Sequence, residues 1–183
     1  ASQVKLTGLL VLYNNVLQSL FRSQILTIGV VFLAIMAMFL VLFRSLKIAF
    51  VAILPSMLAS GSVLGLMGWL GIPLDVMTIT IAAICIGIGV DHSIHYIHRF
   101  RSEIKQQASV RIAIEKSHAS TGKAIYYTSV IIVVGFSILG LSNFIPTIYF
   151  GIFTAFAMLV ALIANLTLLP LLLLGINSGK IKR

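Results

Sequence analysis

The feature that most constrains this chain is the length of its uncharged runs. No Asp, Glu, Lys or Arg occurs between Lys123 and Lys180, and the stretch from Ser23 to Phe43 is also free of charge. A helix needs about 20 mostly apolar residues to cross the roughly 30 Å hydrocarbon core of a bilayer. These runs therefore predict membrane-spanning helices, and their hydrophobicity is continuous rather than alternating as in a membrane β-barrel.

Composition supports the same class of protein. Of the 183 residues, 60% are hydrophobic and only 9% are charged. In soluble domains about 45–50% of the residues are apolar and about 25% are charged. So few charges exclude a soluble globule, and so high a hydrophobicity excludes disorder. The single cysteine, Cys85, excludes a disulfide framework and a cysteine-based zinc cluster. We expect an all-α, polytopic membrane helix bundle.

Charged residues and one turn signal divide this bundle into five predicted spans. Arg22, Arg44, Lys47 and Asp75 bracket the first two, and the turn-forming segment 142–147 divides the last uncharged run. The predicted spans cover residues 23–43, 48–70, 77–98, 124–141 and 148–174. They form a five-helix transmembrane domain over residues 23–174.

The basic residues predict the orientation of the bundle. The chain has 13 Lys and Arg residues. All of them except Lys5 and Arg22 lie in the first loop, the third loop or the C-terminal tail. By the positive-inside rule, that side is cytoplasmic and the N-terminus lies outside. The net charge of +9 then reflects topology, and we expect no nucleic-acid partner. The tail, residues 175–183, is expected in the cytoplasm.

Two segments outside the spans are predicted to form amphipathic helices at the membrane surface. Residues 1–22 end the extracytoplasmic region, and their apolar stripe is Leu9, Leu12, Tyr13, Val16, Leu17 and Leu20. Residues 99–123 form the cytoplasmic segment, with Ser109 as N-cap and Gly122 as the residue after the helix. Its apolar face comprises Val110, Ala113, Ile114 and Ser117. Because the chain begins at Ala1 without a signal-peptide pattern, we expect an internal piece of a longer protein.

Asp91 is the strongest candidate for a functional residue. It is the only acidic residue deep within a predicted span, where an ionised carboxylate costs at least about 2.5–3.5 kcal/mol. A low dielectric disfavours the charged form, so Asp91 would exchange a proton readily. The alternative is a carboxylate that stays protonated or extends toward the cytoplasmic edge.

Glycines and histidines surround Asp91 on the same predicted helix. Gly87 lies one turn before it, on the same face, and with Gly89 would let another helix approach closely and enclose the carboxylate. His92 follows directly, and His95 and His98 continue the Asp91 stripe at i+4 and i+7. Because histidine titrates near neutral pH, the stripe predicts a proton or hydration path. Plain interfacial residues and a zinc site are the alternatives.

Other spans supply candidate packing residues and hydroxyl partners. Pro55 removes one backbone hydrogen bond from span two and favours a bend, and Gly61 and Gly65 begin a stripe of small residues suited to tight packing. The candidate partners of Asp91 are Thr128, Ser129 and Asn165. No nucleophile–base pair, phosphate-binding loop or ATPase motif is visible. We therefore expect neither an enzyme nor a cofactor.

The stretch from Gly87 to Arg101 resembles the resistance–nodulation–division (RND) exporters, in particular the MMPL or Patched-like branch. Leu42–Lys47, Gly68–Asp75 and Gly122–Ile125 resemble further family segments in family order. His92 departs from the family pattern, which often has Asp or Tyr after the Asp. The resemblance implies one transmembrane half of a transporter in a bacterial inner membrane, without its first helix and extracytoplasmic domain.

The same resemblance implies proton coupling at Asp91, across an interface with the other half. We expect proton-driven export of a lipid-like or amphiphilic molecule, with protons, membrane lipids, that substrate and the remaining half as partners. The proton-coupling set is Asp91, His92, His95, Thr128 and Ser129. One alternative is a sterol-sensing-like module that binds lipid or a partner without pumping. Another is a metal-cation exporter.

Overall fold

The computed structural model describes residues 26–27, 29–72, 76–106 and 109–177, and within them every regular element is a helix. The expected all-α membrane bundle is confirmed. Four helical stretches are long and apolar enough to cross a membrane: Leu46–Trp69, Thr80–Lys105, Val110–Leu141 and Ile145–Ile176. A shorter apolar helix, Gly29–Phe43, precedes them. The predicted amphipathic helix in residues 1–22 lies outside the described residues, as do 23–25 and 178–183.

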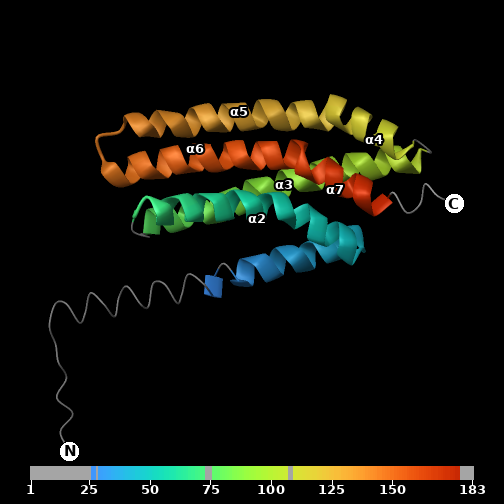
Figure 1. Cartoon of the computed structure of the whole chain (residues 1–183), viewed down its shortest axis with the longest axis horizontal. Helices are drawn as coiled ribbons and strands as arrows, with labels where there is room; N and C mark the ends of the chain where they lie inside the picture. Colours follow the sequence, from blue (N-terminus) through green and yellow to red (C-terminus); the bar gives the residue numbers. More distant parts are fainter. Residues whose placement is uncertain (1–25, 28, 73–75, 107–108, 178–183) are drawn as a thin grey trace, which may run out of the picture.

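The elements follow one another closely along the chain. Their bounds are α2 Leu46–Trp69, α3 Val76–Lys105, α4 Val110–Ser117, the π-helix η1 His118–Gly122, α5 Lys123–Ile138, the 3-10 helix η2 Leu139–Leu141, α6 Ile145–Leu166 and α7 Leu168–Asn177. Elements α4, η1, α5 and η2 form one continuous rod. Figure 1 shows this rod along one edge of the molecule and the Gly29–Phe43 helix along the opposite edge.

The central elements are α3 and α6. Helices α2 and α6 both pack against α3 and against each other, and α5 packs against α6 (Figure 1). One apolar cluster joins α3 to the Gly29–Phe43 helix and α7 through buried residues such as Phe39, Tyr96 and Leu169. A second joins α2, α3 and α6 through Met67, Ile81 and Phe153. Helix α3 is therefore held on several sides.

The cytoplasmic segment begins as the sequence predicts but does not end there. The Ser109 hydroxyl caps α4 by accepting a hydrogen bond from the backbone N–H of Ile112 at 3.4 Å, and Ala113 and Ser117 are buried. The prediction that Gly122 follows the helix end is wrong. A terminating glycine takes a left-handed conformation, but Gly122 has φ −59° and ψ −41° and continues through η1 into α5.

The helical stretch Ile145–Ile176, which contains the predicted span 148–174, is interrupted at Thr167. Helix α6 ends at Leu166 and α7 begins at Leu168. Pro170 has no N–H to donate to the carbonyl of Leu166, and its ring crowds that carbonyl. At the break itself, the Thr167 hydroxyl donates a hydrogen bond to the Ile163 carbonyl at 2.6 Å. The turn before α6 matches its prediction, because η2 ends at Leu141 and α6 starts at Ile145 with a proline in its first turn.

Close helix contacts occur at two glycines. A Cβ at Gly89 would lie 2.6 Å from the Ser56 hydroxyl of α2, and one at Gly151 would lie 2.6 Å from the Phe136 carbonyl of α5. Gly61 and Gly65 have no atom within 4 Å of such a Cβ. Within the described residues these two glycines make none of the expected tight packing. They lie on the exposed face of α2, opposite buried residues such as Val63.

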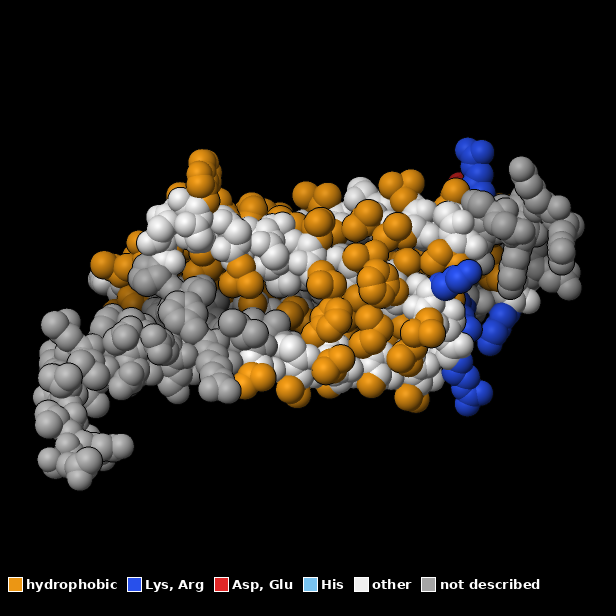
Figure 2. All heavy atoms as spheres, turned by 60° about the horizontal axis from the view of Figure 1, so that its bottom comes forward, with side chains coloured by type: hydrophobic (Ala, Val, Ile, Leu, Met, Phe, Trp, Pro, Cys, Tyr) orange, Lys and Arg blue, Asp and Glu red, His pale blue; other side chains and the backbone are white. Residues whose placement is uncertain are grey.

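The basic side chains gather at one end of the bundle. Figure 2 shows Lys and Arg at that end, beside a broad hydrophobic surface. The described members are Arg44, Lys47, Arg99, Arg101, Lys105, Arg111, Lys116 and Lys123. Large apolar side chains such as Leu33, Val41, Ile131 and Leu171 are exposed along the sides. A charged end and apolar sides are what a bilayer requires of a spanning bundle.

Candidate functional site: a groove beside Asp91

Asp91 lies near the middle of α3, and its side chain is 65% exposed. Among the described residues its recorded polar contact is with His95, one turn further along the helix. The two side chains approach to 3.5 Å, from the carboxylate Oδ1 to Nε2 of an imidazole that is itself 67% exposed. The described bundle therefore does not enclose this carboxylate, although Asp91 lies near the centre of the candidate span Thr80–Lys105.

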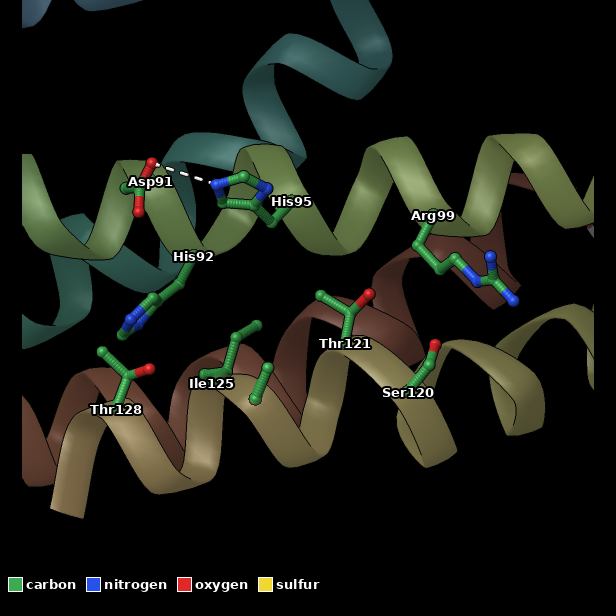
Figure 3. A pocket seen from close by; sticks show the side chains of 9 residues that line it. Asp91, His92, His95, Arg99, Ser120, Thr121, Ile125 and Thr128 are labelled. Atoms are coloured by element: carbon green, nitrogen blue, oxygen red, sulfur yellow. Dashed lines mark ion pairs between the residues drawn. The ribbon is translucent and has the colours of Figure 1, made fainter.

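The carboxylate borders a groove between α3 and the η1–α5 rod. Helix α3 packs chiefly against α2 and α6, and α5 packs chiefly against α6, so the two walls meet each other less closely. The space between the walls has a volume of about 490 Å³. Figure 3 shows the side chains that line it. They are Asp91, His92, His95 and Arg99 from α3 and Ser120, Thr121, Ala124, Ile125 and Thr128 from the opposite wall.

His92 forms the inner part of this groove. His92 is only 5% exposed, and its Nδ1 atom is buried with no hydrogen-bond partner among the described residues. In Figure 3 the imidazole extends from α3 toward Thr128 on α5. Leaving a buried polar atom unpaired costs free energy, and a water molecule in the groove would satisfy it. The arrangement thus places an exposed carboxylate and two imidazoles along one groove.

The candidate partners from other helices lie apart from Asp91. Thr128 lines the same groove on the opposite wall. Ser129 faces away from the groove, and its buried hydroxyl has no partner among the described residues. Asn165 accepts a hydrogen bond from the Ser93 hydroxyl at 2.9 Å and donates to the Ala161 carbonyl at 2.9 Å. Its amide therefore fixes α3 to α6 and does not reach the carboxylate.

The two glycines before Asp91 lie on opposite sides of α3. Gly89 contacts Ser56 and brings α2 close to α3. Gly87 shares the exposed face of Asp91, and a Cβ there would meet nothing within 4 Å. Pro55 is buried inside α2, next to Ser56, and the helix continues through it. The close approach made by the described bundle thus lies behind Asp91, and the surface in front of it is open.

The three-residue stripe proposed from sequence divides between two sites. Asp91 and His95 border the groove, whereas His98 lines a different pocket beside the Gly29–Phe43 helix. Among the residues that the structure describes, no three His, Cys, Asp or Glu side chains are placed to hold one metal ion. No observation therefore favours the metal-exporter alternative.

Two polar contacts near the groove were not anticipated from sequence. The Tyr96 hydroxyl lies 2.6 Å from Nδ1 of His118 in η1, and Tyr96 is fully buried. Glu103 is buried between Arg99, at 2.7 Å, and Lys116 of α4, at 3.3 Å. The i, i+4 spacing of Arg99 and Glu103 was a signal that sequence reasoning could have used. No sequence signal indicated the contact of Glu103 with Lys116 of α4 or that of Tyr96 with His118 of η1.

These features define a class: a polytopic α-helical membrane module with a groove, lined by a carboxylate and imidazoles, beside the middle of one candidate spanning helix. The chain belongs to the MMPL family, whose model matches residues 1–179. This confirms the resemblance noted from the Gly87–Arg101 region. Family membership makes the chain a membrane transporter-like module within a multi-pass membrane protein.

Two curated relatives are similar over most of the chain. MJ1562 of Methanocaldococcus jannaschii is 32% identical over 152 residues, which cover 83% of this chain and 39% of that protein. YdgH of Bacillus subtilis strain 168 is 28% identical over 166 residues, or 88% of this chain and 18% of that protein. Both are named only as inferred membrane proteins. The chain thus spans about two fifths of one relative and under one fifth of the other.

Proposed function

We propose that this module belongs to a proton-driven exporter of lipid-like or amphiphilic molecules, in which Asp91 takes up a proton from outside and releases it toward the cytoplasm. The observation that carries the proposal is the exposed carboxylate in the middle of α3. A charge at that depth costs at least about 2.5–3.5 kcal/mol against lipid, and intramembrane carboxylates almost always face protein or a water-filled cavity. The groove at Asp91 is therefore a surface that meets something other than lipid tails.

The remaining half of the same transporter is the proposed cover of this groove. The open side of α3 carries Gly87 and Asp91, so a second helix has room to approach the carboxylate closely. Both curated relatives are more than twice as long as the segment they share with this chain. The proposed assembly would enclose Asp91 when the halves close and admit water when they part.

The groove also supports a route toward the cytoplasmic side. Beyond Asp91, the α3 wall continues through His95 to Arg99, and Ser120 and Thr121 lie on the opposite wall at the same end. Hydroxyls and imidazoles that line a hydrated groove can pass protons along it. In this orientation the basic end of the bundle faces the cytoplasm of a bacterial inner membrane, with the N-terminus outside.

The energy available to such a cycle is adequate. One charge that crosses a potential of 100 mV supplies about 2.3 kcal/mol, and each pH unit across the membrane adds about 1.36 kcal/mol. A few protons per cycle would sustain a substantial gradient of substrate. The substrate leaves chemically unchanged, so we propose no enzymatic activity for the module.

The test is proton-coupled efflux by the intact protein with Asp91→Asn. The amide keeps the size of the side chain but cannot gain and lose a proton, so we expect efflux and proton flux to fall to background. Glu115→Gln is the matched control, because it neutralises an exposed carboxylate on α4, and it should leave both rates unchanged. Full efflux by Asp91→Asn would refute the proposal. Lipid binding without pH dependence or transport would favour the sterol-sensing-like alternative.

A further inference from the structure

A second pocket lies on another face of α3, nearer the basic end of the bundle. It has a volume of about 330 Å³ and is lined by Leu42 and Phe43 of the first apolar helix and by His98, Arg101, Ser102 and Lys105 of α3. None of these residues lines the Asp91 groove. The proposed proton-driven export uses none of them, so this pocket raises a separate question.

The pocket concentrates positive charge that the described residues do not neutralise. Arg101 donates a hydrogen bond from Nη1 to the Phe43 carbonyl at 3.0 Å and lies over the Phe43 ring, 5.9 Å from its centroid. These contacts hold the guanidinium in place but leave its charge unpaired. Lys105 is exposed, and no described carboxylate lies within ion-pair distance of it or of Arg101. The nearest acid in sequence, Glu103, is already held by Arg99 and Lys116.

The surroundings match a lipid headgroup rather than a soluble ligand. Leu42 is 48% exposed beside the pocket and offers an apolar wall that acyl carbons would cover. Arg101 and Lys105 belong to the basic residues at one end of the bundle, and basic residues next to the end of a membrane span attract anionic phospholipid headgroups. The pocket's volume is at the lower end of the roughly 300–1,000 Å³ of ligand sites, so it suits a headgroup and not a whole lipid. A fixed guanidinium fork and a nearby ammonium are the donors that a phosphate group prefers.

We propose that this pocket binds the phosphate headgroup of an anionic phospholipid, with Arg101 and Lys105 as its cationic ligands. The lipid would bridge the Gly29–Phe43 helix and α3, and so stabilise the contact that Arg101 makes with the Phe43 carbonyl. Free inorganic phosphate offers the same ligand chemistry, but it would gain nothing from the apolar wall at Leu42. The proposal does not depend on proton coupling at Asp91.

The test uses the intact protein in detergent, titrated with phosphatidylglycerol and analysed by native mass spectrometry. Each basic residue near a membrane surface contributes about 1 kcal/mol to anionic lipid binding. We therefore expect Lys105→Gln to weaken phosphatidylglycerol binding about fivefold. Arg111→Gln is the matched control, because it removes an exposed charge from the same end of the bundle outside the pocket, and it should retain wild-type affinity.

Three further comparisons decide the outcome. Arg101→Gln should weaken binding at least as much as Lys105→Gln, with a thermal-unfolding measurement to verify that it folds; if it does not, Lys105→Gln alone decides. Phosphatidylcholine should bind more weakly, because its choline cation is repelled, and equal binding would overturn the proposal. Equal losses of phosphatidylglycerol affinity in Lys105→Gln and Arg111→Gln would also overturn the proposal. Displacement by inorganic phosphate at equal concentration would overturn the assignment to a lipid.

Discussion

Helix α3 carries two carboxylates about 18 Å apart along its axis, and their surroundings are opposite. Glu103 has a side chain only 3% exposed and lies between the cations of Arg99 and Lys116. Asp91 is 65% exposed and meets only the imidazole of His95 within the described part of the chain. The first carboxylate joins α3 to α4 and is committed to structure. The second has no Lys or Arg partner among the described residues, and it is the group to which we assign proton coupling in the proposed function.

The glycines of α3 show the same difference between an inner and an outer face. Gly89 lies against Ser56 at a distance that leaves no room for a methyl group, whereas Gly87 faces open space. The inner face, with Gly89, Tyr96 and Glu103, is packed and paired. The outer face, with Gly87, Asp91 and His95, is free for a partner. Four predictions test this comparison, in order of their expected effect on stability.

The largest effect is expected when Glu103 loses both cations. The double variant Arg99→Gln/Lys116→Gln leaves a buried carboxylate unpaired, which should lower the free energy of unfolding by about 3 kcal/mol. Thermal unfolding of the intact protein in detergent measures the change. Arg111→Gln/Lys123→Gln removes two exposed cations from the same end and should have little effect. Equal losses of stability in the two double variants would show that the ion pairs of Glu103 do not stabilise the fold.

A smaller loss is expected at the close helix contact. Gly89→Ala requires Ser56 to shift, because the new methyl group would lie 2.6 Å from the Ser56 hydroxyl and 3.2 Å from its Cβ. Overpacking of this kind costs about 1–3 kcal/mol. Gly87→Ala on the open face should lose no stability, since alanine favours helix by up to about 1 kcal/mol. Its transport rate in the intact protein should fall if another helix covers this face. Equal stability of the two variants would contradict the comparison.

Removal of one buried hydroxyl should have a still smaller effect. Tyr96→Phe deletes the hydrogen bond to His118 that fixes α3 to η1, and a typical net loss is about 1 kcal/mol. Tyr126→Phe is the control, because its ring is half exposed on α5. Unchanged stability of Tyr96→Phe, measured by the same unfolding assay, would mean that this contact does not hold the groove wall.

The smallest effect on stability is expected at the pair beside the groove. His95→Gln removes the partner of Asp91, but an exposed i, i+4 pair contributes only about 0.3–0.5 kcal/mol. The free energy of unfolding should therefore change by less than the error of most assays. A loss above about 1 kcal/mol would show that Asp91 and His95 form a structural pair, and the distinction between the two faces would fail.

Much of this architecture follows from the position of charge in the sequence. The uncharged runs predict the long helices, and Ser109 and the segment 142–147 predict a helix start and a turn that the structure contains. The break at Thr167, within the candidate span Ile145–Ile176, is also encoded in the sequence, by Pro170. Gly122 was misassigned because a glycine ends a helix only when its conformation changes, and Gly122 keeps helical dihedral angles.

The candidate site was only partly predictable. The periodicity of α3 places Asp91 and His95 on one side, which the structure shows. His92 and Thr128, two members of the set proposed from sequence, line the same groove. The sequence does not reveal that Ser129 lies outside the groove, or that Asn165 is occupied by Ser93. Those relations join helices that are far apart in the sequence. Local spacing carries no information on how such helices are arranged.

The sequence by itself determined that the chain crosses a membrane, roughly where its helices lie, and which carboxylate is costly there. Hydrophobic transfer and helical periodicity act on neighbouring residues, so a single chain records them directly. Only the tertiary structure decided that Glu103 is paired, that Asp91 is open and that a groove separates α3 from α5. Those outcomes depend on which helix faces which, and that is fixed by the packing of many side chains at once.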